Sequence, residues 1–239
     1  MATFVLVHGA WHGSWCWKRV RSALQAQGHE VFTPTLTGVG ERSHLLSPDI
    51  DLRTHVLDVA NLILWEDLTD VVLCGHSYGG CVITGAADLV ADRIAALVYL
   101  DAFTPGHGES LHDLLPPEQR QMQLDGSREL GEGWKTPPIP AAVFKVNAAD
   151  RDWVDAQCGM QPTATFTQKQ SLTGAADKIA DVTYILADWE GSPFPACRDR
   201  AARRGWNTLE VACGHDVMLD DPQTLTAMLS EVGERVARA

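Results

Sequence analysis

One stretch of the chain reads Val71-Val72-Leu73-Cys74-Gly75-His76-Ser77-Tyr78-Gly79-Gly80. Its first four residues are apolar, as in a strand covered on both faces, and they lead directly into Gly-x-Ser-x-Gly and a segment that suits a helix. So sharp a turn from strand to helix strains the serine backbone and crowds its neighbours, and glycine is therefore needed two positions before and two after Ser77. The pattern predicts that the Ser77 hydroxyl stands above a sheet, beside a helix N-terminus whose dipole favours developing negative charge.

Short apolar runs alternate with helix-period segments on both sides of this turn, which is typical of βα units around a mainly parallel sheet. We expect six strands, near residues 3–7, 30–34, 71–74, 94–100, 182–187 and 208–212. Helices are expected at residues 14–27, 52–68, 79–90, 195–203 and 222–237. The sequence thus predicts an α/β fold with helices on both faces of a six-stranded sheet.

The alternation stops between about residues 103 and 181, where prolines interrupt short polar and apolar stretches. We expect an inserted cap over the carboxyl edge of the sheet, because the segment carries large apolar side chains and α/β folds keep their ligand crevice at that edge. The chain then divides into a core of residues 1–102 and 182–239 and a cap of residues 103–181. The apolar side chains in question are Leu111, Leu114, Leu115, Trp134, Phe144, Trp153 and Phe166.

Composition limits the kind of partner. The 239 residues, 45% hydrophobic and 21% charged, suffice for one large core. A net charge of −12 repels phosphate backbones and anionic lipid, so we expect neither nucleic acid nor a membrane surface as partner. No apolar run approaches the ~20 residues that span a bilayer, and because only Met-Ala-Thr precedes the first apolar run we expect no signal peptide. We expect a cytoplasmic protein that binds a small molecule, and the sequence leaves open whether it forms a homodimer.

A serine hydroxyl needs a base before it can act as a nucleophile, and His215 is the best placed of nine histidines. It follows the last predicted strand and is the only histidine beyond His112. Where Gly-x-Ser-x-Gly follows a strand in this way, serine, acid and histidine occur in that chain order. His76 is expected to point away from the site and pack. His8 and His12 lack a carboxylate nearby in the sequence, so we expect no metal site.

The partner of His215 is expected to be a carboxylate that accepts a hydrogen bond from Nδ1 and stabilises the imidazolium. Asp188 and Glu190 follow the predicted strand at 182–187, and Asp101 ends the strand before it. We rank Glu190 first, Asp101 second and Asp188 third.

An oxyanion formed at the site needs two N–H donors. One comes from the residue after the nucleophile and the other from the loop after the first strand. These are the backbone N–H groups of Tyr78 and Ala10.

Four segments together resemble the hydroxynitrile lyase and plant methylesterase family of the α/β-hydrolase superfamily, and especially its bacterial carboxylesterase branch, which includes pyrethroid hydrolases. They are residues 4–17, 34–44, 75–80 and 214–218. The likeness covers the whole core, whereas in the insertion only residues 161–166 are recognisable. The resemblance implies the α/β-hydrolase fold, Ser77 and His215 as nucleophile and base, an oxyanion hole at Ala10 and Tyr78, and no cofactor.

The resemblance also bears on the reaction. Members that cleave cyanohydrins carry a threonine after the first-strand histidine and a lysine after the catalytic histidine, and this chain has Gly9 and Asp216 there. A carboxylate beside the base is expected to repel cyanide. The family's acid is usually an aspartate after the strand at 182–187, and the aligned residue is Glu190.

We therefore expect a serine carboxylesterase that hydrolyses small hydrophobic esters, aromatic ones included, through an acyl-enzyme. Because a fold does not fix a function, a cofactor-free lyase or oxygenase and a non-catalytic receptor for small molecules stay as alternatives.

Overall fold

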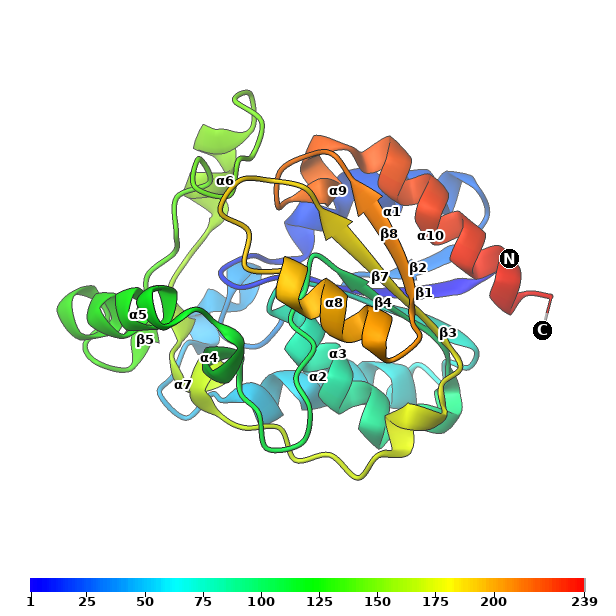
Figure 1. Ribbon diagram of the computed structural model, residues 1–239, viewed down its shortest axis with the longest axis horizontal. Helices are drawn as coiled ribbons and strands as arrows, with labels where there is room; N and C mark the ends of the chain where they lie inside the picture. The colour runs from blue at the N-terminus through cyan, green and yellow to red at the C-terminus, as the bar shows by residue number, and fades with distance from the viewer. Residues whose placement is uncertain (239) are drawn as a thin grey trace.

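Six parallel strands in the order β2-β1-β3-β4-β7-β8 form the central sheet of the computed structural model, which describes residues 1–238 (Figure 1). Each lies within two residues of its predicted position, so the predicted α/β architecture is confirmed. The strands are β1 (Thr3–Val7), β2 (Glu30–Phe32), β3 (Val71–His76), β4 (Ile94–Leu100), β7 (Asp181–Ala187) and β8 (Asn207–Val211).

Helices cover both faces of this sheet, because the strands are apolar on both sides. Val5 and Val7 of β1 face one core, whereas Phe4 and Leu6 face the other. The first core is closed by α2 (Leu52–Trp65), α3 (Gly79–Leu89) and α8 (Pro195–Arg203). The second is closed by α1 (Lys18–Ala26), α9 (Val217–Asp220) and α10 (Pro222–Val236), and Figure 1 shows the two helix groups on opposite sides of the sheet.

The predicted helices agree with the observed ones, apart from the first. Residues 14–27 divide into a 3-10 turn, Ser14–Trp17, followed by α1. Further 3-10 turns span Gly40–Leu45, Ala91–Arg93 and Ala175–Lys178. No helix within residues 1–238 has both the length and the apolar character that crossing a membrane requires.

The insertion between β4 and β7 contains elements, most of them short, that the sequence pattern does not predict. They are α4 (Leu111–Leu114), α5 (Pro117–Leu130), β5 (Lys135–Thr136), α6 (Arg151–Gln157), β6 (Gln161–Pro162) and α7 (Ala164–Thr167). β5 and β6 pair antiparallel. Figure 1 shows α5 and α6 projecting beyond the carboxyl ends of the strands.

The last part of the insertion returns along the helix layer. The carboxylate of Asp88, on α3, accepts the N–H groups of Thr173, Gly174 and Ala175. The division of the chain into a core and a cap of residues 103–181 stays a proposal.

Candidate active site

Ser77 lies on the turn between β3 and α3, in the left-handed backbone region with a φ of 55°. Such a conformation costs a non-glycine residue about 1–3 kcal/mol and persists only where its surroundings impose it. A Cβ on Gly75 would lie 2.5 Å from the carbonyl oxygen of Gly79, and one on Gly79 would lie 2.8 Å from that of Val7. The glycines are therefore needed for close backbone approach, and together they hold Ser77 at the carboxyl edge of the sheet.

The partner of His215 is Asp101. The Nδ1 of His215 lies 2.6 Å from Asp101 Oδ2, and both side chains are buried. The same carboxylate accepts the indole N–H of Trp189 at 2.8 Å and the backbone N–H of Ala187 at 3.1 Å. Two further donors thus hold one buried carboxylate against the imidazole, which suits a group that must stabilise an imidazolium.

This geometry disagrees with the order in which the sequence ranks the carboxylates. The Glu190 side chain is 93% exposed, and its nearest charged partner is Lys145 at 3.5 Å. Asp188 is also exposed. The loop after β7 turns the Trp189 indole inward to Asp101 and leaves its acids in solvent. Asp101 instead points at His215 from the end of β4, where its own φ of 41° redirects the chain.

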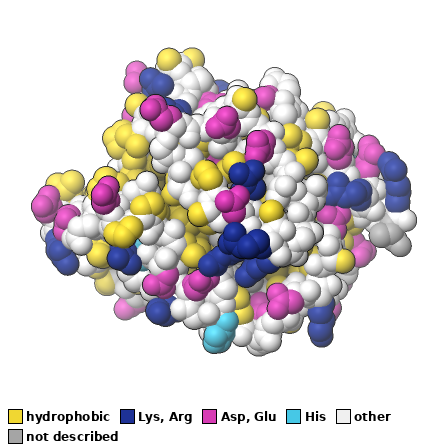
Figure 2. Space-filling model, in the orientation of Figure 1, with side chains coloured by type: hydrophobic (Ala, Val, Ile, Leu, Met, Phe, Trp, Pro, Cys, Tyr) yellow, Lys and Arg dark blue, Asp and Glu magenta, His cyan; other side chains and the backbone are white. Residues whose placement is uncertain are grey.

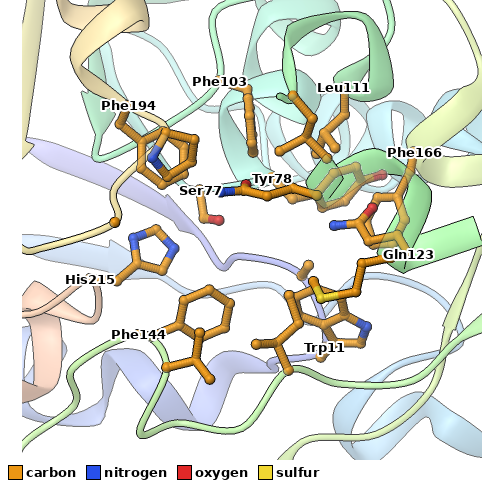
Figure 3. Close-up of a pocket in the computed structure, with 18 of the residues that line it drawn as sticks. Trp11, Ser77, Tyr78, Phe103, Leu111, Gln123, Phe144, Phe166, Phe194 and His215 are labelled. Atoms are coloured by element: carbon orange, nitrogen blue, oxygen red, sulfur yellow. The ribbon is translucent and has the colours of Figure 1, made fainter. Parts of the chain in front are cut away.

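The ring of His215 is held from several sides. The backbone N–H of His215 donates to the carbonyl oxygen of Phe144 at 2.9 Å, and the carbonyl oxygen of His215 lies 3.0 Å from His76 Nε2. Phe194 stacks on the imidazole at 5.0 Å between ring centroids, with 11° between the planes. Figure 3 shows His215 and the Ser77 hydroxyl side by side at one end of the pocket. His76 points away from the pocket, as predicted, and fastens the loop that carries the base.

Two backbone donors at the pocket have no acceptor. Within residues 1–238, neither the Ala10 N–H nor the Tyr78 N–H donates a hydrogen bond, and both residues line the pocket beside Ser77. Tyr78 immediately precedes α3, so its N–H lies at the positive end of that helix. This pair of free donors can receive an oxygen that becomes negatively charged.

His8 orients one of those donors. Its Nε2 accepts the N–H of Leu36 at 3.0 Å, so the ring proton sits on Nδ1 and is donated to the carbonyl oxygen of Gly9 at 2.8 Å. That carbonyl belongs to the same planar peptide group as the Ala10 N–H. Burial lowers the pKa of His8 to about 3, so the ring is neutral.

The pocket is a cavity of about 260 Å³ with a predominantly apolar lining. Its polar side chains are Ser77, His215, Gln119 and Gln123. Met122 and Val143 line it and are more than half exposed. Figure 2 shows hydrophobic side chains gathered between the insertion and the core on this face. The remaining lining is Ala10, Trp11, Tyr78, Phe103, Leu111, Leu115, Ile139, Phe144, Phe166, Trp189, Gly191, Pro193 and Phe194.

Asp216 does not act as the sequence suggested. Its carboxylate is fully buried, lies 3.1 Å from His12 Nε2 and 3.8 Å from His76 Nε2, and is not among the groups lining the pocket. Burial acts to raise its pKa, but the charge of His12 and the hydrogen bond from it hold that pKa below the usual range. Its negative charge is therefore paired with His12 and does not face a ligand in the pocket. His12 and Asp216 are 204 positions apart, and no local pattern in the sequence indicates the contact.

The chain is similar to known proteins in both sequence and fold. The family described as "Alpha/beta hydrolase family" matches residues 4–228. The carbendazim hydrolyzing esterase of Nocardioides sp. (strain SG-4G) is 46% identical over 98% of this chain and 100% of its own. Methylesterase 7 of Arabidopsis thaliana is 36% identical over 98% of this chain and 97% of its own. An extracellular alpha/beta-hydrolase from a Paenibacillus species superimposes with a TM-score of 0.85 at 24% identity, covering 98% and 99% of the two chains.

Proposed function

The chain belongs to the alpha/beta hydrolase family, and on that premise we propose that it is a serine carboxylesterase that hydrolyses small hydrophobic esters. The observation that carries the proposal is the buried pair of His215 and Asp101 beside Ser77 on its strained turn, at the end of an apolar pocket. Relatives similar over nearly the whole chain are named as an esterase and a methylesterase, which supports the same reaction class.

The proposed reaction begins with attack of Ser77 Oγ on the ester carbonyl carbon. His215 takes the hydroxyl proton on Nε2, while Asp101 accepts Nδ1–H, fixes the tautomer and stabilises the imidazolium. The carbonyl oxygen becomes an oxyanion, which the N–H groups of Ala10 and Tyr78 receive. When the tetrahedral intermediate collapses, the bond to the alcohol oxygen breaks and His215 returns its proton to the leaving alkoxide.

The second half of the cycle releases the acid. Water gives a proton to His215 and attacks the acyl group on Ser77, and the same two N–H donors receive the second oxyanion. The bond between the acyl carbon and Ser77 Oγ then breaks, and the serine recovers its proton from His215. This sequence uses only side chains and backbone groups of the chain itself, and it calls for no cofactor.

The pocket favours esters with an apolar body. Aromatic side chains dominate the wall opposite the nucleophile, among them Trp11, Phe144 and Phe166 (Figure 3). Each apolar Å² that a ligand removes from water is worth about 25 cal/mol, so an aryl or alkyl group adds affinity that a charged group does not. The relatives' names make carbendazim and methyl esters compounds to include in a first panel. The cytoplasm as compartment and a homodimer as assembly remain predictions.

Steady-state hydrolysis of p-nitrophenyl and aryl-alkyl esters by the wild type and by Ser77→Ala tests the proposal. We expect turnover by the wild type and a loss of roughly 10⁴-fold or more in kcat for the variant, because the nucleophile and its base act as a unit. A folded Ser77→Ala protein with wild-type turnover would refute it. Binding without turnover would favour the receptor, and oxygen consumption would favour the oxygenase.

A further inference from the structure

We propose that His12 is a positioning residue, whose imidazolium ties the loop that presents the Ala10 N–H to the loop that carries His215 and thereby fixes the oxyanion hole. The inference deepens the proposed function and rests on it. His12 itself does not line the pocket.

The two partners of the His12 ring determine its protonation. Nδ1 lies 2.7 Å from the carbonyl oxygen of Ala10, and Nε2 lies 3.1 Å from the carboxylate of Asp216. Neither a carbonyl oxygen nor a carboxylate can donate, so each hydrogen bond requires a proton on the ring. Both nitrogens therefore donate, and His12 is positively charged. Trp15 covers its ring face at 4.9 Å, nearly parallel.

The groups around His12 favour this charge. Burial acts to lower the pKa of His12, but Asp216, together with Cys158 at 3.9 Å from Nδ1, raises it well above the usual value. Two neighbouring histidines add no competing positive charge, because burial lowers the pKa values of both His8 and His76. Asp216 is the carboxylate that acts on the His12 ring, and it follows the base directly in the chain.

The loop after β1 needs such support because its backbone is strained. Trp11 has a φ of 64°, which costs a bulky residue roughly 1–2 kcal/mol. The peptide group between Ala10 and Trp11 is held at both ends, since His12 donates to its oxygen and its N–H donates to Gln161 Oε1 at 2.8 Å. The preceding peptide is held at its oxygen by His8. Of the two N–H groups in these peptide groups, that of Trp11 is bonded and that of Ala10 has no acceptor within residues 1–238, and Ala10 lines the pocket.

Of His8, His12 and Gln161, it is His12 that also contacts the loop carrying His215, through the carboxylate of Asp216. Asp216 follows His215 directly and is fully buried, and its other oxygen lies 3.8 Å from His76, which also contacts the carbonyl oxygen of His215. Removing His12 would leave Asp216 as an unpaired buried charge next to the base and free the Ala10 carbonyl. Both loops would then shift, and the Ala10 N–H would no longer meet the oxyanion.

The test compares His12→Leu with His44→Leu, which removes an exposed histidine that does not line the pocket. We expect His12→Leu to lower kcat roughly 10- to 100-fold, less than the roughly 10²- to 10³-fold cost of deleting an oxyanion donor outright. KM should change less than about threefold, because ground-state binding uses the apolar pocket. His12→Asn, which keeps a donor near the Nδ1 position, should recover part of the loss.

A pair of inhibitors separates positioning from general damage. An aryl trifluoromethyl ketone forms a tetrahedral adduct with Ser77, whereas the matched methyl ketone binds without one. His12→Leu should lower the affinity for the trifluoromethyl ketone by the same factor as kcat and leave the affinity for the methyl ketone unchanged. Equal weakening of both ketones, or unchanged kcat in His12→Leu, would overturn the inference while leaving the esterase in place. A wild type that hydrolyses no ester would overturn both.

Nuclear magnetic resonance of the wild type keeps the inference testable if His12→Leu fails to fold. In protein labelled with ¹⁵N-histidine, His12 should show two slowly exchanging ring N–H signals at pH 7, assigned by their disappearance in His12→Asn. A single ring proton, or a ring that titrates near pH 6.5, would contradict the doubly donating imidazolium.

Discussion

Asp101 is the residue at which sequence and structure differ most. Ser77 and His215 could be singled out from the sequence because short local patterns mark them, a strand before Gly-x-Ser-x-Gly and a histidine after the last strand. The choice of carboxylate depends on which way side chains leave two irregular turns, and no sequence period encodes that direction. The available signal was a single polar residue directly after the buried strand β4, at the same sheet edge as Ser77.

The first prediction concerns this carboxylate. Asp101→Asn should lower kcat by roughly 10²- to 10⁴-fold, because an amide cannot stabilise the imidazolium and can hold His215 in the wrong tautomer. Glu190→Gln, which changes an exposed carboxylate in the same way, should stay within about twofold of the wild type. Steady-state kinetics on one ester measures both. If Glu190→Gln proves as damaging as Asp101→Asn, the carboxylate assignment is wrong.

At the scale of elements, the core could be predicted and the insertion could not. Strands β1, β4 and β7 are mainly apolar runs bounded by turn residues, so their positions follow from the pattern alone. The insertion is built from pieces of two to four residues, such as β5 and β6, apart from α5 and α6. So short an element carries only about one period of hydrophobic alternation, so no repeat can be recognised, and it is defined by tertiary contacts.

The second prediction tests the turn between β3 and α3. Gly75→Ala should destabilise the fold by about 1–3 kcal/mol, since its Cβ would press on the Gly79 carbonyl, whose backbone cannot yield easily. Gly159→Ala is the matched control, because a Cβ there meets nothing within 4 Å. Urea unfolding measures the two free energies. Equal stabilities would show that the turn is not as tightly packed as described.

The third prediction concerns the contact between the insertion and the loop after β1. Gln161→Leu removes the acceptor for the Trp11 N–H, a hydrogen bond that joins β6 to the strained turn across 150 positions. We expect kcat to fall roughly 3- to 30-fold with the fold retained, because the loop is still held by His8 and His12. Gln168→Leu, also in the insertion but bonded to Asp51 at the start of α2, should leave kcat within about twofold. An equal effect of the two would point to general loosening of the insertion.

For the whole molecule, buried histidines set the pH dependence of stability. Burial lowers the pKa values of His8, His55 and His76, and the value for His8 falls to about 3. A histidine with a lowered folded pKa contributes stability that is present above its unfolded pKa near 6.5 and is lost as the pH falls below that value. His12 has the opposite sign: its contribution is present below pH 6.5 and is lost as the pH rises through its raised folded pKa.

The fourth prediction follows from these signs. The free energy of unfolding should be lower at pH 5 than at pH 7, with His8 alone accounting for a loss of roughly 2 kcal/mol. Stability should decline again at alkaline pH as His12 loses its proton. Urea unfolding between pH 5 and pH 9 measures the loss of stability at acid pH and the loss at alkaline pH. A protein that is as stable at pH 5 as at pH 7 would contradict the neutral state of the buried histidines.

Trapping the acyl-enzyme and locating it tests nucleophilic catalysis by Ser77 without intermediate assumptions. Wild-type protein mixed with a slowly deacylating aryl ester should gain, in intact-mass spectra, the mass of one acyl group, and peptide mapping should place that group on Ser77. Ser77→Ala should gain none. Turnover without an adduct, or an adduct on another residue, would contradict nucleophilic catalysis by Ser77.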